Sequence, residues 1–179
     1  KKRDEFVGYV DEASKGKRRI WVFCGDGCEG SSHSHALVTP DRGLQQKAYL
    51  AVIRSMLRDG DIPYVIRGTP WHTGPMALDE ERVASDLFPD FKTPVEPVTQ
   101  AFSRYEVRLL VNGTLFNATH HIGTTRSPIS EATALTTQLV KAARNAGRWG
   151  ERLPDILVRA HRHQFCMVHV PGLRQGQCC

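Results

Sequence analysis

Short apolar runs that favour β-strands alternate along this sequence with longer segments whose apolar residues recur at helical spacing. The pattern predicts helices at 41–60, 76–88 and 127–147, a β-hairpin at 104–121, and single strands at 18–24, 62–68, 156–160 and 165–172. Such alternation is typical of an α/β fold with layered β-sheets flanked by helices. Because the chain has 179 residues and no internal repeat, we expect one domain spanning residues 1–179.

Local sequence signals mark where several of these elements begin and end. Asp41 is suited to cap the first of the three helices, and Gly60 to end it. Asn112-Gly113 is the strongest short signal for a two-residue hairpin turn. Ser127 and Gly147 are expected at the two ends of the longest helix.

Bulk composition favours an intracellular globular protein with an anionic partner. No apolar run approaches the roughly 18 residues that a membrane span requires, and the N-terminus has no signal-peptide pattern. The five cysteines show no disulfide framework or zinc-ribbon spacing, which favours a reducing compartment and a cytoplasmic location. The net charge of +5 is compatible with a phosphate ester or nucleic acid as partner, and equally with solubility alone.

Polar side chains follow four of the expected strands, at the point where each strand ends. The residues at these strand ends are Asp26, then Thr69 and His72, then His120 and His121, and finally His161 and His163. A single histidine at such a place is more often structural than functional. Ligands of open α/β sheets bind outside the carboxyl ends of the strands, so the coincidence of four strand ends indicates a functional site.

Carboxylate and imidazole groups in this combination point to metal chemistry. They bind Zn²⁺, Mn²⁺ or Fe, and Asp26 could bridge two ions. His161 and His163 are two residues apart and face the same side in extended backbone. A two-metal site clamps a phosphoryl group and activates water for attack. The sequence contains neither a nucleophile-elbow serine motif nor a phosphate-binding P-loop.

The ordered set of motifs resembles the calcineurin-like metallophosphoesterases, in particular their phage and prophage branch. "GDGCEG" resembles the family's second motif, "RGTPWHTG" a variant of the third, "THHIG" the fourth and "AHRHQF" the fifth. The resemblance covers residues 18–170. It implies a four-layer α/β/β/α sandwich and one or two divalent ions of Mn, Zn, Fe or Mg.

The resemblance also implies roles for individual residues. The metal ligands would be Asp26, His121, His161 and His163. His72 or His120 would protonate the leaving oxygen, and metal-activated water would attack phosphorus. Arg67 and Arg126 could bind phosphate oxygens, although solvation at the surface is an alternative for both. The expected activity is hydrolysis of a phosphoester, with a phosphodiester such as nucleic acid as the first candidate.

One family motif has no counterpart in this sequence. An Asp-x-His motif, which supplies two ligands to the first metal, is missing before residue 18. Either the chain is shortened at its N-terminus or one metal is held more weakly, and we expect at most one tightly bound ion. An alternative function is a weak or inactive phosphoesterase scaffold that serves as a binding or structural protein. A mononuclear metal hydrolase acting on a bond other than a phosphoester is a further alternative.

Overall fold

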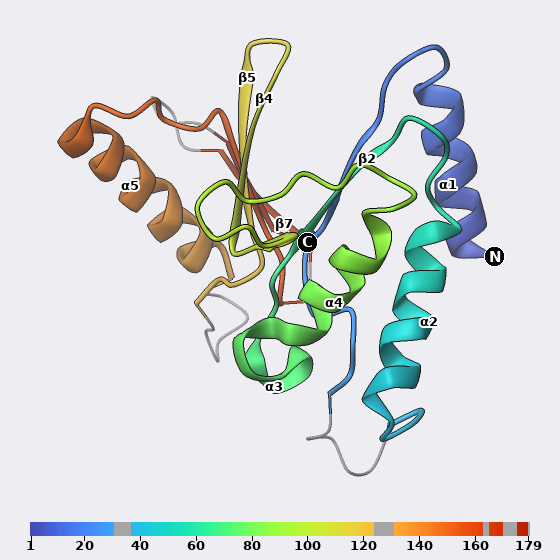
Figure 1. The fold of residues 1–179 in the computed structure, drawn as a ribbon. Helices are drawn as coiled ribbons and strands as arrows, with labels where there is room; N and C mark the ends of the chain where they lie inside the picture. The colour runs from blue at the N-terminus through green and yellow to red at the C-terminus, as the bar shows by residue number, and fades with distance from the viewer. Residues whose placement is uncertain (31–36, 124–130, 163–164, 170–174, 179) are drawn as a thin grey trace.

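The fold is mixed α/β, with two small β-sheets flanked by helices (Figure 1). The computed structural model describes residues 1–30, 37–123, 131–162, 165–169 and 175–178. None of the helices within these ranges is long and apolar enough to cross a membrane.

The three predicted helices lie at the predicted places, but they begin or end at other residues than predicted. The described helices are α1 (Lys2–Ala13), α2 (Arg42–Arg54), α3 (Pro70–Thr73), a 3₁₀ turn at Pro75–Ala77, α4 (Leu78–Leu87) and α5 (Glu131–Trp149). Asp41 caps α2 as predicted, because its carboxylate accepts hydrogen bonds from the amides of Gly43 and Leu44 at 2.8 and 3.1 Å.

The strands form one parallel sheet and one mixed sheet. The first sheet has the order β1-β2-β3 and contains β1 (Ile20–Phe23), β2 (Ile62–Ile66) and β3 (Ser103–Arg104). The second has the order β4-β5-β6-β8-β7 and contains β4 (Glu106–Val111), β5 (Thr114–Thr119), β6 (Ile156–Arg159), β8 (Gln175–Cys178) and β7 (Cys166–His169). The predicted hairpin is confirmed: β4 and β5 pair antiparallel, and Asn112 and Gly113 both have the positive φ that a tight hairpin turn requires.

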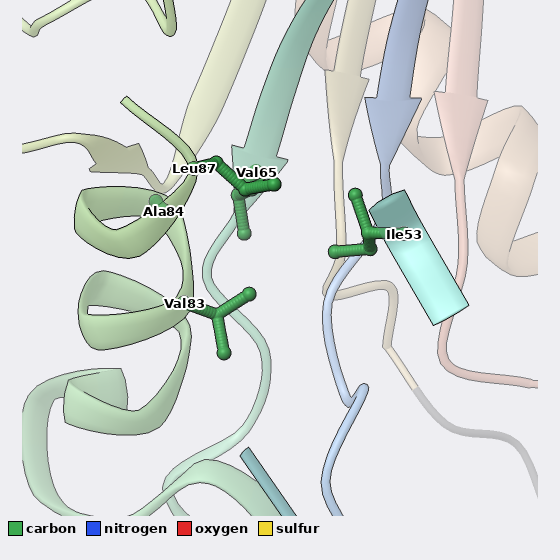
Figure 2. Close-up of a cluster of buried hydrophobic side chains, with 5 residues drawn as sticks. All are labelled: Ile53, Val65, Val83, Ala84 and Leu87. Carbon is green, nitrogen blue, oxygen red and sulfur yellow. The ribbon is translucent and has the colours of Figure 1, made fainter. Parts of the chain in front are cut away.

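One hydrophobic cluster joins the helices to the parallel sheet. Figure 2 shows Ile53 of α2, Val65 of β2, and three residues of α4, Val83, Ala84 and Leu87, which are all almost fully buried. Since each buried branched side chain contributes about 1.5–3 kcal/mol relative to exposure, this cluster fixes α4 against β2. The start of α4, which lies beside the end of β2, is thereby held in place.

A second cluster lies between the two sheets. Ile66 of β2 packs with Val107 of β4 and Ala118 of β5, and side chains from β1 and β6 surround them. An apolar cavity of about 560 Å³ lies next to this cluster, lined by residues such as Val22, Leu109 and Val158. A third cluster joins α5 to the mixed sheet through Leu135 and the β7 side chains. The two sheets therefore face each other, with α2 and α4 outside one and α5 outside the other.

Two expectations about helix ends were wrong, and one strand was not predicted. The helix predicted to reach Gly60 ends at Arg54, and Gly60 has φ +85° in the turn before β2. The last helix continues through Gly147 to Trp149, and Gly150 takes the positive φ that follows it. Strand β8 was not predicted, because its segment lacks an apolar run, yet it lies between β6 and β7. Ser127, the expected cap of α5, lies outside the described residues.

Candidate metal centre

Three strand ends from both sheets meet at one point. Asp26 follows β1, His120 follows β5 and His161 follows β6 by two residues. One ligand atom from each of these side chains lies within 4.8 Å of the others. The two imidazoles come from the mixed sheet and the carboxylate from the parallel sheet, so the packing of the two sheets creates the group.

The separations within this triad are those of ligands around one small cation. His120 Nε2 lies 2.8 Å from Asp26 Oδ2 and 3.2 Å from His161 Nδ1, and His161 Nδ1 lies 3.6 Å from Asp26 Oδ2. Tetrahedral ligands that are each about 2.0–2.1 Å from Zn²⁺ stand about 3.3 Å apart. The donor set of two imidazoles and one carboxylate, with its spacing, fits a divalent ion that retains an open coordination position.

A backbone carbonyl fixes the orientation of His120. Its Nδ1 lies 2.5 Å from the carbonyl oxygen of Cys24, and a carbonyl can only accept, so Nδ1–H is the donor. Nε2 then faces the Asp26 carboxylate and the His161 ring, and in the absence of a metal ion it can carry a proton and donate it to Asp26 in a hydrogen bond. Metal-binding histidines commonly make such a second hydrogen bond, because it selects the tautomer and holds the ring. A cation, either a proton or a metal ion, must offset the facing lone pairs.

Thr69 holds the carboxylate of Asp26 from the other side. The Thr69 amide donates to Asp26 Oδ1 at 2.7 Å, and the Thr69 hydroxyl lies 3.1 Å from the same oxygen. Oδ1 is therefore engaged by the loop after β2, while Oδ2 faces the two imidazoles. Thr69 therefore positions the Asp26 carboxylate and is not itself a member of the triad.

The loops after β1 and β2 approach closely enough to require glycine. A Cβ on Gly68 would overlap the backbone nitrogen and Oδ1 of Asp26, and would lie 2.9 Å from Glu80 Oε1. A Cβ on Gly25 would lie 2.8 Å from both the Gly68 Cα and His120 Nδ1, and Gly25 also has φ +77°. Real Cβ atoms do not make such contacts, so only glycine permits this approach.

Two members of the triad adopt backbone conformations that L-residues avoid. Asp26 has φ 53° and His161 has φ 75°. Non-glycine residues in this region carry a conformational cost of order 1–3 kcal/mol and cluster at functional sites. Two of the three members of the triad therefore carry a backbone cost at the candidate site.

The pKa values within the triad reflect mutual interaction. Burial alone would raise the pKa of Asp26, but hydrogen bonds from His120 and Thr69 outweigh it and lower this pKa to about 2. Burial opposes protonation of His120, yet the Asp26 carboxylate and the Cys24 carbonyl raise its pKa. Burial and the neighbouring His120 lower the pKa of His161. The carboxylate is therefore ionised at neutral pH, as a metal ligand must be.

A fully buried carboxyl group stands behind the triad. Glu80 of α4 is 0% exposed, and its Oε2 accepts a hydrogen bond from the Gly68 amide at 2.6 Å. Burial raises the pKa of Glu80 to about 7, against the effect of the Gly68 and Asp26 amides. The sequence pattern does not single out Glu80, because an acidic first helical turn ordinarily faces solvent.

The structure brings together only some of the residues predicted for the site. Asp26 and His161, both predicted ligands, lie in the triad, but the third member is His120, which was assigned to acid catalysis. His121, the predicted ligand, is exposed, with its ring centroid 5.2 Å from that of His161. The alternation of β5 explains the difference, since Phe116, Ala118 and His120 face the parallel sheet. His163 lies outside the described residues.

The remaining predicted residues are not members of the triad or lie outside the described residues. His72 lies on α3, with Nδ1 3.2 Å from the carbonyl oxygen of Glu29. Arg67 donates to the Ser103 hydroxyl at 2.8 Å, contacts Glu81 at 3.4 Å and lies over the Tyr105 ring. These contacts tie Arg67 to β3 and α4. Arg126 lies outside the described residues, so its role as a phosphate-binding group stays a prediction.

Comparison with known proteins adds little to this geometry. No protein-family model matches the chain, and no curated protein matches it. One similar solved structure is that of an archaeal phosphodiesterase, with 12% identity, coverage of 90% of this chain and 81% of that chain, and a TM-score of 0.40. Another, from Thermotoga maritima, was solved in solution by NMR, with 13% identity, coverage of 90% and 83%, and a TM-score of 0.34. At these TM-scores neither likeness carries an argument, so function rests on the site.

Proposed function

We propose that the protein is a metal-dependent phosphoester hydrolase with its centre at Asp26, His120 and His161. The observation that carries the proposal is the convergence of these three ligand atoms within 4.8 Å at the carboxyl ends of strands from two sheets. The facing sheets, with helices outside both, also support the four-layer α/β/β/α arrangement of the metallophosphoesterases. We propose one divalent ion per chain, because the described residues supply one compact set of three ligands.

The residues of the triad have distinct tasks in this proposal. A bound divalent ion supplies Lewis acidity, which polarises a phosphoryl oxygen and lowers the pKa of water. Asp26 supplies the negative charge, and Thr69 keeps its Oδ1 turned away from the imidazoles. The Cys24 carbonyl holds the proton of the neutral His120 ring on Nδ1, which would leave Nε2 available to the ion. Three protein ligands leave room for a substrate oxygen, as catalytic zinc sites do.

His121 is the residue best suited to meet the leaving oxygen in this arrangement. It is exposed and its ring lies beside that of His161, so a substrate held at the triad would reach it without displacing a ligand. His120, which was predicted for acid catalysis, is used as a ligand here. His72 remains a second proposed proton donor, on helix α3, whose N-cap residue is Thr69.

The proposed substrate class is a phosphodiester, with nucleic acid as the first candidate. The net charge of +5 supports a polyanionic substrate. Trp71, next to His72 on α3, is 60% exposed and offers an aromatic surface for a base.

The test compares His161→Ala with His169→Ala. His169 is exposed on β7 and lies outside the triad, so its replacement removes an imidazole without removing a proposed ligand. We expect His161→Ala to lose bound metal and the hydrolysis of an aryl phosphodiester, and His169→Ala to keep both. Metal content by elemental analysis and initial rates with added Mn²⁺ or Zn²⁺ are the measurements. Unchanged metal content in His161→Ala would reject the assignment, whereas metal binding without hydrolysis would favour the scaffold alternative.

A further inference from the structure

The apolar cavity between the two facing sheets is large enough to hold a ligand. Its volume is about 560 Å³, within the range of small-molecule sites. Strand β1 and the segment before it form one wall, and β4, β5 and β6 form the other. Apart from Arg18 and Cys24, all the lining side chains are aliphatic or aromatic. Cavities of this character hold water poorly and accept apolar groups.

The cavity is closed at the end that lies toward the metal centre. Strand pairing places Val107, Ala118 and Val158 in one row across three strands of the mixed sheet. Val107 and Ala118 are almost fully buried. On the opposite wall the carbonyl of Cys24 binds the His120 imidazole, which ties the end of β1 to the end of β5. The triad residues themselves do not line the cavity.

The other end of the cavity is open. Ile20, the first residue of β1, is 40% exposed although it lines the cavity, and Val111 at the end of β4 is half-buried. Figure 1 shows the tip of the β4–β5 hairpin and the segment that leads into β1 at the same end of the molecule. A side chain in a sealed interface between sheets would be almost fully buried, so the exposure of Ile20 marks the mouth of the cavity.

Arg18 places an available positive charge at this mouth. Its side chain is exposed, and no acidic side chain is among the described residues that line the cavity. Across residues 1–30, 37–123, 131–162, 165–169 and 175–178, the Arg18 guanidinium makes no hydrogen bond or ion pair. The adjacent Arg19, by contrast, donates to Asp61 from Nε at 2.8 Å and is neutralised by it. The cavity therefore combines an apolar interior with one unpaired cation at its entrance.

We propose that the cavity between the sheets binds a long-chain monocarboxylate, with its acyl chain inside and its carboxylate at Arg18. One unpaired guanidinium matches one negative charge, and its planar donors suit the two oxygens of a carboxylate. The wall from Arg18 to Cys24 is up to about 20 Å long in extended backbone, which accommodates an extended acyl chain. Each methylene that leaves water for the apolar interior strengthens binding. This site does not depend on the proposed hydrolase activity.

The first test titrates the protein with laurate and with three probes that each lack one feature of the proposed ligand. Caprate has a shorter chain, butyrate has almost no chain, and dodecanol has the chain without the charge. By calorimetry we expect saturable binding of laurate, about tenfold weaker binding of caprate and no measurable binding of butyrate. Amide NMR shifts should accompany laurate binding at Val22, Leu109 and Val158.

The second test compares Arg18→Gln with Arg144→Gln. Both arginines are exposed, but Arg144 lies on α5 and does not line the cavity, so the two variants change the net charge equally. We expect Arg18→Gln to weaken laurate binding at least about fivefold without affecting dodecanol, and Arg144→Gln to change laurate binding less than about 1.5-fold. Val22→Phe fills the cavity and should abolish binding of both ligands. Thermal unfolding shows whether this variant folds, and the two arginine variants do not depend on it.

Laurate binding to His161→Ala separates this site from the metal centre. We expect that variant to bind laurate as the unmodified chain does, whatever happens to its metal binding. Loss of laurate binding in His161→Ala would assign the carboxylate to the metal centre and overturn the proposal. Equal weakening by the two arginine variants, equal affinity for laurate and butyrate, or no saturable binding of laurate would each overturn it as well.

Discussion

Replacing Gly68 with alanine tests how closely the loops after β1 and β2 must approach. The added Cβ would overlap Asp26 and lie 2.9 Å from the buried Glu80 carboxyl, so no flexible, exposed atom can move aside. Overpacking of this kind destabilises by about 1–3 kcal/mol. Displacement of Asp26 would also break its hydrogen bonds from Thr69, worth about 1.5–3 kcal/mol to a charged acceptor.

The two contributions are not additive, and we expect Gly68→Ala to lower the free energy of unfolding by about 3 kcal/mol. For a chain of this length that corresponds to a fall in Tm of about 6–12 °C. The variant should also bind Zn²⁺ or Co²⁺ much more weakly, because Asp26 Oδ2 leaves the triad. Thermal unfolding of the metal-free protein and calorimetric metal titration are the two assays.

Gly8→Ala is the matched control, since the chemical change is identical. Gly8 lies within α1, and a Cβ there would have nothing within 4 Å. Alanine in an exposed helix should stabilise the protein by about 0.5–1 kcal/mol, with metal binding unchanged. If Gly68→Ala unfolds within about 1 °C of the unmodified protein and binds metal normally, the close approach argued from the structure is wrong.

Three further predictions address charge and burial. Asp61→Ala should destabilise the protein by about 3–5 kcal/mol, because Arg19 is 5% exposed and donates to Asp61 from Nε at 2.8 Å. Asp90→Ala is the control: Asp90 forms an exposed pair with Arg54, and its loss should change stability by less than about 1 kcal/mol. Equal effects of the two substitutions in urea unfolding would contradict this prediction. Asp26 has a pKa of about 2 when folded against 3.8 as its ordinary value, so it stabilises the metal-free protein above pH 4 by about 2 kcal/mol, and this contribution is lost as pH falls from 4 to 2. Unfolding measured across that range should show a shallower loss in Asp26→Asn, and an unchanged slope would refute the assignment. The pKa of Glu80 is raised from 4.5 to about 7, so its contribution to the free energy of unfolding falls as pH rises from 4.5 to 7. Glu80→Gln should therefore be more stable than the unmodified protein at pH 8 but not at pH 4. The same difference in stability at both pH values would contradict this prediction.

The strand ends of the candidate site could be predicted from the sequence. The choice between the adjacent His120 and His121 depends on the two-residue alternation along β5. Asp26 and His161 follow apolar runs, and the structure places both in the triad. His120 and His121 lie next to each other, and the family resemblance favoured His121. The backbone pairing of β5 continues to His120, whose carbonyl accepts from the Ala160 amide at 3.1 Å. Counting by two from Phe116 would have placed His120 toward the parallel sheet.

Other features could not be read from local patterns. Strand β8 has no apolar run, and its place between β6 and β7 depends on pairing with both neighbours. Glu80 lies between Asp79 and Glu81 in an acidic stretch typical of a solvated helix start, yet all its surface is buried. Its burial results from the packing of α4 on β2, which the sequence does not specify locally. In the sequence, Gly25 and Gly68 mark only the ends of strands. The close contact between their two loops explains why both positions require glycine.

Metal titration of single-histidine variants tests the proposed centre most directly. The dialysed protein and its His120→Ala, His121→Ala and His161→Ala variants would be titrated with Zn²⁺ or Co²⁺ by calorimetry. The triad geometry predicts one tightly bound ion per chain, lost in His120→Ala and His161→Ala and retained in His121→Ala. Absence of binding in the unmodified protein, or binding that survives His120→Ala and disappears in His121→Ala, would contradict the assignment of the metal centre.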